Sequence, residues 1–233
     1  MSLNRDYVNR ALLGVVLLVI SVILVMPVIY AVVTSFKLQA DILSPDPTFF
    51  PRRLELSNYS YVFERSSRYL RYYYNSTVIT VSGVVLTTLL STMGGYAFAR
   101  LPFTGRGAIM GFILFIITFP LAVLLIPIYI MEYNTGLLNT HLGLILPNVT
   151  TVLPFSIFVM RSVFLSIPKE LEESAEIDGA SVFGTWARIM LPIALNGVSI
   201  VIIFSFCNIW GEYILAKTLA TEDYAMPISV GLT

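Results

Sequence analysis

Side chains that could do chemistry are few in this sequence, and many of them lie in one short stretch. The stretch EESAEIDGASVFGTWARIMLP, from Glu172 to Pro192, is rich in carboxylates and contains an Asp178–Gly179 pair, whereas the sequence on either side is almost entirely apolar. A segment with acidic, small and aromatic side chains is suited to docking a partner, but a plain acidic surface loop has the same composition. The residue types alone leave both interpretations open.

The sequence lacks the common patterns of catalysis. It has no H-E-x-x-H or G-x-S-x-G motif, and its single histidine, His141, follows LLNT near an expected loop, where a structural role is the commoner one. None of its lysines lies in a G-x4-G-K-[S/T] loop, so the chain cannot bind ATP through that motif. The single cysteine, Cys207, has no partner for an internal disulfide. We expect a chain that is not itself an enzyme and holds no metal or cofactor.

The composition indicates a membrane protein. The 233 residues are 57% hydrophobic and 12% charged, with a net charge of zero. Soluble domains carry about 25% charged residues. A neutral chain of this kind gives no reason to expect a nucleic-acid partner.

Apolar runs of the length needed to cross a bilayer, about 20 residues, set the expected architecture. A backbone in hydrocarbon must satisfy its own hydrogen bonds, so we expect each run to be a helix. The fold class is therefore all-α, a polytopic transmembrane bundle forming one domain over residues 1–233. The expected spans are about 11–36, 72–99, 107–131, 140–163 and 190–216. Within the third and fourth runs, we expect interruptions at Pro120, Pro127, Pro147 and Pro154.

The orientation follows from the short basic loop Arg100–Arg106, which favours a cytoplasmic N-terminus under the positive-inside rule. These spans would then leave the C-terminus outside. The last stretch, Met226–Thr233, would rise only about 12 Å as a helix, against a hydrocarbon core of roughly 30 Å. We expect the natural protein to continue into a sixth span.

The polar segment 166–192 has the pattern of a helix–turn–helix. Pro168 fits a first helical position, and the acidic residues that follow suit the positive end of the helix dipole. Asp178–Gly179 predicts a helix stop, since glycine adopts the left-handed conformation without penalty. Ser181 can cap a second short helix that carries Phe183 and Trp186.

One motif in this segment resembles a known family signature. Glu173-Ser174-Ala175, then Gly179, then Ile189-Met190-Leu191-Pro192 is similar to the signature of the integral membrane subunits of binding-protein-dependent ABC importers, with Ser174 where alanine is usual. The stretches GGYAFARLPFTGR, LLIPIYIMEYNTGLLNTHLGLILP and WGEYILA resemble the sugar-importing branch, its maltose-permease-like second subunit especially. The resemblance covers the chain from the first span onward.

The resemblance implies that this loop is a coupling helix–turn–helix that docks in a cleft of a cytoplasmic ATPase subunit. Glu173 would meet a basic residue of the ATPase, Ala175 would allow close approach, and Gly179 would make the turn. The residues implied for coupling are Glu173, Ser174, Ala175, Asp178, Gly179, Ile189, Leu191 and Pro192. The implied partners are a second permease subunit, two ATPase subunits and an extracytoplasmic solute-binding protein, at the inner (cytoplasmic) membrane.

The implied solute is a sugar, an oligosaccharide or a glycerol-phosphate-type compound, and the sequence does not identify which one. Polar residues that could contact it are Asn148, Thr150, Asn208 and Tyr213. In maltose-type permeases the loop that matches LATEDYAMP probes the docked binding protein, so we expect that contact at Glu222, Asp223 and Tyr224; a simple solvated turn is the alternative.

Other transport functions stay open. One is a permease of a non-sugar ABC importer. Another is an ion-coupled secondary transporter, for which Glu212 is the candidate membrane acid. Snorkelling or interhelical hydrogen bonding is an equal contender for Glu212. A membrane-embedded enzyme is the third rival, without a supporting motif.

Overall fold

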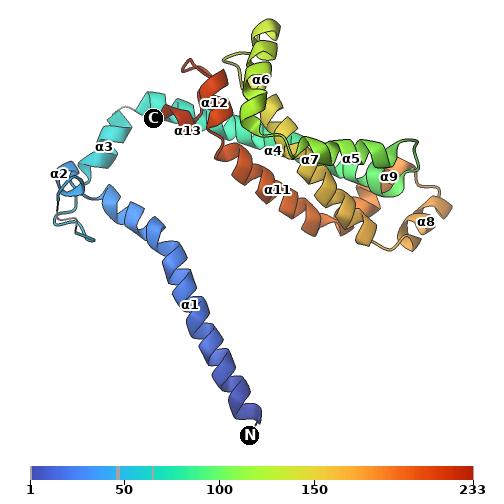
Figure 1. Ribbon diagram of the computed structural model, residues 1–233, viewed down its shortest axis with the longest axis horizontal. Helices are drawn as coiled ribbons and strands as arrows, with labels where there is room; N and C mark the ends of the chain where they lie inside the picture. The colour runs from blue at the N-terminus through green and yellow to red at the C-terminus, as the bar shows by residue number, and fades with distance from the viewer. Residues whose placement is uncertain (1, 46–47, 65, 233) are drawn as a thin grey trace. The chain divides into compact units, whose positions relative to one another are not determined.

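The regular elements of the chain are helices. The computed structural model describes residues 2–45, 48–64 and 66–232, and no strand occurs within them (Figure 1). The helices form two compact units, Met1–Ser66 and Ser67–Thr233.

The first unit is a long apolar helix followed by a folded-back segment. Helix α1 (Ser2–Ser35) continues through Pro27, and no residue of its apolar stretch Leu12–Ser35 is buried, as suits a helix surrounded by lipid. This matches the expected first span. After α2 (Gln39–Ile42), the chain returns to α3 (Ser57–Glu64), where the Asn58 side-chain amide donates to the carbonyls of Ser35 (3.0 Å) and Lys37 (2.9 Å).

The second unit is built on three long helices. These are α4 (Ser66–Arg100), α7 (His141–Ser166) and α11 (Leu195–Trp210). One buried apolar cluster joins Ile79, Leu144 and Ile209, and another joins Tyr96, Phe164 and Trp186. A Cβ on Gly95 would lie 2.9 Å from the backbone nitrogen of Arg161, so the close helix approach expected at the Gly94–Gly95 pair occurs between α4 and α7.

The expected third span, 107–131, is interrupted at Pro120, as predicted. It consists of α5 (Arg106–Ile116) and α6 (Leu121–Thr135), which are bent by 99° (Figure 1). Pro120 precedes α6 in an extended conformation and accounts for the break. The other three prolines lie inside α6 and α7, which continue through them, so the interruptions expected there were wrong. Transmembrane helices tolerate proline where neighbouring groups satisfy the freed carbonyl.

The expected fifth span, 190–216, contains several helical elements. The chain enters it through α9 (Val182–Thr185), the π-helical turn η1 (Trp186–Met190) and α10 (Leu191–Ile193), with a bend of 81° before α11. Helix α11 ends at Trp210 and a new helix, α12 (Ile214–Leu219), follows. The break has a local cause: the Glu212 carboxylate accepts from the backbone N–H groups of Leu215 (2.8 Å) and Ala216 (2.9 Å), which starts α12.

The number of spans depends on how the bent helices are counted. Three helices are long and apolar enough to cross a membrane, or up to five if each bent pair is one span, among the residues that the structure describes. The stretch Met226–Thr233 contains the short helix α13 (Ile228–Gly231), while Thr233 lies outside the described residues.

Candidate functional site

The acidic segment folds as the sequence predicts. Helix α8 (Glu170–Ile177) ends at Asp178, and Gly179 takes a left-handed φ of 81°. The N–H of Ala180 donates to the Ala175 carbonyl at 2.9 Å, which closes the turn. The Ser181 hydroxyl accepts from the N–H of Gly184 at 3.1 Å and caps α9. One detail differs: α8 begins after Lys169, so Pro168 stands before the helix and not at its first position.

Most residues that the resemblance assigns to coupling are exposed on this helix–turn–helix. Glu173, Ser174, Asp178, Gly179 and Pro192 are exposed, and Ile189 and Leu191 are half-buried. Ala175 is buried at 4% exposure, so its small side chain permits close packing with its own chain. Glu173 forms an ion pair with Lys169 at 3.1 Å, and both side chains are more than half exposed. Exposed pairs of this kind contribute little stability and are readily exchanged for another partner.

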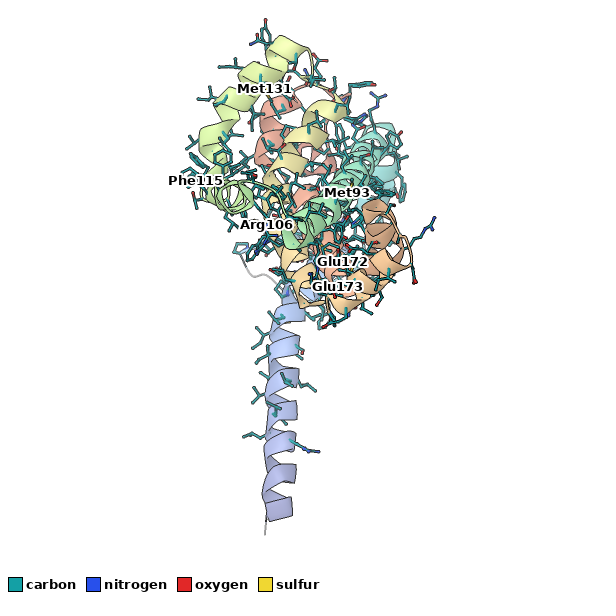
Figure 2. The ribbon with its side chains drawn as sticks, turned by 90° about the vertical axis from the view of Figure 1, so that its right-hand side faces the viewer. Met93, Arg106, Phe115, Met131, Glu172 and Glu173 are labelled. Atoms are coloured by element: carbon teal, nitrogen blue, oxygen red, sulfur yellow. The ribbon has the colours of Figure 1, made fainter. Side chains whose placement is uncertain are left out.

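Glu172, the residue before Glu173, points the opposite way and is 6% exposed. Its carboxylate accepts a hydrogen bond from the Tyr96 hydroxyl and lies 3.4 Å from Arg100 Nε. Arg100 Nη2 donates to the carbonyls of Phe164 (2.8 Å) and Ile167 (2.5 Å), at the end of α7. This buried network ties α8 to α4 and α7, while Glu173 beside it stays accessible; Figure 2 shows the two glutamates next to each other, at the end of the unit away from Met131.

Glu172 is not among the residues predicted from the sequence, although the spacing of the residues around it is a signal. Tyr96 and Arg100 lie four residues apart on α4, so they share one helix face. Glu172 and Ala175 share a face of α8 in the same way, and both are buried. Beside this network, a hollow of about 440 Å³ is lined by Tyr96, Arg100, Arg106, Lys169, Glu172, Glu173 and neighbours.

The second candidate site is a cavity of about 360 Å³ among α5, α6, α7 and α11, which we term the inner cavity. Asn148, Thr150 and Asn208, three of the residues expected to contact solute, all line it. Tyr213 is absent from the described lining residues and is 40% exposed. The lining also includes Glu132, which was not predicted from the sequence. Glu132 separates two apolar runs, and a charged residue in that place usually marks an exposed helix end.

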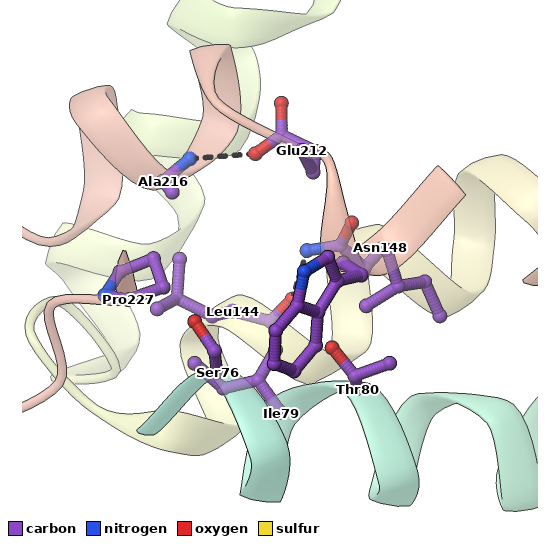
Figure 3. Close-up of a pocket in the computed structure, with 10 residues that line it drawn as sticks. Ser76, Ile79, Thr80, Leu144, Asn148, Glu212, Ala216 and Pro227 are labelled. Carbon is purple, nitrogen blue, oxygen red and sulfur yellow. Dashed lines mark hydrogen bonds between the residues drawn. The ribbon is translucent and has the colours of Figure 1, made fainter. Parts of the chain in front are cut away.

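Glu212 and His141 have local structural partners. The Glu212 carboxylate caps α12, and beneath it lies a cavity of about 10 Å³, the size of one water molecule, lined by Ser76, Thr80 and Asn148 among others (Figure 3). His141 Nε2 is 2.9 Å from Asn75 Oδ1, a link between α7 and α4. These contacts favour hydrogen-bonding roles for both side chains.

The loop after α12 is held in place and presents its polar side chains outward. The Asn139 side-chain oxygen accepts from the N–H groups of Thr221 (2.7 Å) and Glu222 (3.1 Å). The Tyr72 hydroxyl donates to Asp223 at 2.7 Å. Glu222, Asp223 and Tyr224 are nevertheless exposed.

The comparison with known proteins settles the family. A family described as "Binding-protein-dependent transport system inner membrane component" matches residues 89–231, which include the helix–turn–helix and the inner cavity. The chain belongs to this family. It is a multi-pass permease, and its two bent helix pairs and its polar loop lie within the matched region.

Similar permeases are described as sugar transporters. The chain is 34% identical to the diacetylchitobiose uptake system permease protein NgcG of Streptomyces coelicolor, over 98% of this chain and 75% of that protein. It is 33% identical to the sulfoquinovosyl glycerol transport system permease protein SmoH of Agrobacterium fabrum, over 88% of this chain and 72% of that protein. A crystal structure of a bacterial ABC transporter involved in the import of the acidic polysaccharide alginate has the same fold, with a TM-score of 0.83, 24% identity, and coverage of 97% of this permease and 79% of that chain.

Proposed function

We propose that this permease forms part of the translocation pathway of an ATP-driven importer, for a sugar or oligosaccharide that an extracytoplasmic binding protein delivers. The observation that carries the proposal is the family match over residues 89–231, together with relatives described as sugar permeases. A non-sugar importer has no such support. ATP hydrolysis belongs to partner subunits.

The helix–turn–helix is the coupling element in this proposal, over residues 166–192. Its exposed residues Glu173, Ser174 and Asp178 face a cytoplasmic ATPase subunit, and the N-terminus lies on the same side of the membrane. Movement of the ATPase reaches α4 and α7 through the buried Glu172–Arg100 pair. The complete importer has a second permease subunit and two ATPase subunits, and residues 1–233 belong to one transmembrane domain.

Charge reversal at Glu173 tests the coupling role. The Glu173→Lys variant should co-purify with much less ATPase, because a basic residue on the partner would face a cation. Glu222→Lys is the matched control: it makes the same charge change at another exposed position, on the loop after α12. Equal co-purification of the ATPase with wild-type permease and Glu173→Lys would contradict the role given to Glu173.

A further inference from the structure

The inner cavity has a buried carboxylate without a hydrogen-bond donor. Glu132 is 1% exposed, and its Oε2 atom is buried with no hydrogen-bond partner among the described residues. It lies against Gly143, where any Cβ would collide with the carboxylate, so the chain leaves room for this side chain. A buried acceptor without a donor is unfavourable unless a bound molecule supplies one. Glu132 therefore indicates a ligand that donates hydrogen bonds.

Other polar side chains of the inner cavity donate hydrogen bonds to backbone carbonyls of their own helices. The hydroxyl of Thr150 donates to the Leu146 carbonyl, and that of Thr151 donates to the Asn148 carbonyl, both at 2.8 Å. The side-chain amides of Asn148 and Asn208 donate to the carbonyls of Leu144 and Phe204, also at 2.8 Å. Both amide oxygens stay available as acceptors. Each amide also keeps one N–H, but the free acceptor atoms outnumber these donors once Glu132 Oε2 is counted.

The lining contains acidic residues and no basic ones among the described residues. Glu132 and Glu212 are acidic, and the described residues that line the inner cavity include no lysine, arginine or histidine. Sugar hydroxyls donate hydrogen bonds, whereas a carboxylate, sulfonate or phosphate group only accepts them. An anionic sugar would find no cation among the described residues of this lining to balance its charge. The cavity volume of about 360 Å³ lies within the range of small-molecule sites, roughly 300–1,000 Å³.

From this we propose that the inner cavity binds the transported solute through its hydroxyl groups, with Glu132 as the main acceptor, and that it selects uncharged sugars over anionic ones. The inference rests on the proposed importer function and adds the class of sugar.

The test is ATP-driven uptake by the intact importer, with its own ATPase and binding protein, in proteoliposomes. The probes are diacetylchitobiose and arabinobiose, which are uncharged, and digalacturonate, which is anionic. We expect wild type to take up an uncharged probe and not digalacturonate. Glu132→Gln keeps the side-chain shape but exchanges one carboxyl oxygen for an amide NH2 group, which only donates, so a sugar hydroxyl would lose its acceptor. We expect its uptake of the uncharged probe to fall about tenfold or more.

A second pair of variants on α11 separates loss of the site from loss of the fold. Asn208→Leu removes an acceptor from the inner cavity at an exposed position, and uptake should fall. Asn196→Leu makes the same change at another exposed position of α11, outside the cavity lining, and uptake should stay as in wild type. Digalacturonate uptake equal to that of the uncharged probes, or unchanged uptake in both Glu132→Gln and Asn208→Leu, would overturn the inference. A wild-type permease without any co-purifying ATPase or ATP-driven uptake would instead refute the importer function itself.

Discussion

At the scale of single residues, neighbouring glutamates have opposite environments. Glu172 is buried against Arg100 and Tyr96, whereas Glu173 is exposed beside Lys169. Removing one partner of a buried ion pair leaves an uncompensated charge and costs about 3–5 kcal/mol, while an exposed pair contributes about 0–1 kcal/mol. The two positions should therefore respond very differently to the same substitution.

The Glu172→Gln variant should lower the thermal unfolding midpoint of the purified permease complex and reduce ATP-driven uptake, because Arg100 would stay buried without its counter-charge. Its destabilisation should reach about 3 kcal/mol. Glu173→Gln, the matched control, should shift the midpoint little. Both quantities can be followed by thermal denaturation in detergent and by vesicle uptake. If the two variants had equal midpoints, the Glu172 network would have no anchoring role.

The sequence could identify Glu173 and Gly179 but not Glu172 or Glu132. The first two stand in a motif whose spacing is local, and Gly179 is needed for a left-handed turn. The environment of Glu172 depends on Tyr96 and Arg100, which come from a distant helix. The spacing of these residues shows which of them share a helix face, but nothing local in the sequence shows that the two faces meet.

At the scale of elements, apolar runs and prolines predicted which segments are helical, but only some of the points where the helices turn. The hydrophobicity of a run indicates how long the apolar segment is, but not where a helix inside it ends. The turn at Pro120 and the new helix after Glu212 depend on a missing backbone donor and on a side-chain cap. The missing donor of Pro120 can be read from the sequence, and a break there was expected. The cap by Glu212 depends on the folded geometry, so the end of α11 at Trp210 was not expected. The turn at Asp178–Gly179 was predictable, because aspartate and glycine are typical turn residues and glycine adopts a left-handed φ without penalty.

Gly179 gives a sharp test of that turn. A Cβ at Gly179 would contact nothing within 4 Å, so any cost of substitution comes from its φ of 81° and not from a clash. Gly179→Val should strain the turn by about 1–2 kcal/mol and abolish uptake while the permease still inserts in the membrane. Gly179→Asn should retain more uptake, because asparagine tolerates the left-handed region. The test is to measure solute uptake and the amount of permease in the membrane for each variant. Normal uptake in Gly179→Val would show that the turn is not needed for the proposed coupling.

At the scale of the whole second unit, the length of helix α4 gives the distance between two polar regions, the loop after α12 and the helix–turn–helix. Its Tyr72 contacts Asp223 of the loop after α12, and its Tyr96 contacts Glu172 of the helix–turn–helix. Tyr72 and Tyr96 are separated by about 36 Å along the helix axis. This exceeds the hydrocarbon core of roughly 30 Å. If α4 spans the bilayer, the two polar regions must lie at opposite surfaces, so the two proposed docking regions would face different compartments.

Site-specific crosslinking tests this two-sided arrangement. In a Cys207→Ala background, cysteines at Glu222 and Tyr224 should crosslink to the solute-binding protein, because these side chains are exposed on an anchored loop. A cysteine at Val182, exposed at the start of α9, should crosslink to the ATPase instead. Each position serves as the control for the other, since the reagent and the chain are the same. Absence of any binding-protein crosslink from Glu222 and Tyr224 in every nucleotide state would make the loop a simple solvated turn, and crosslinks from both regions to the same partner would contradict the opposite-surface arrangement.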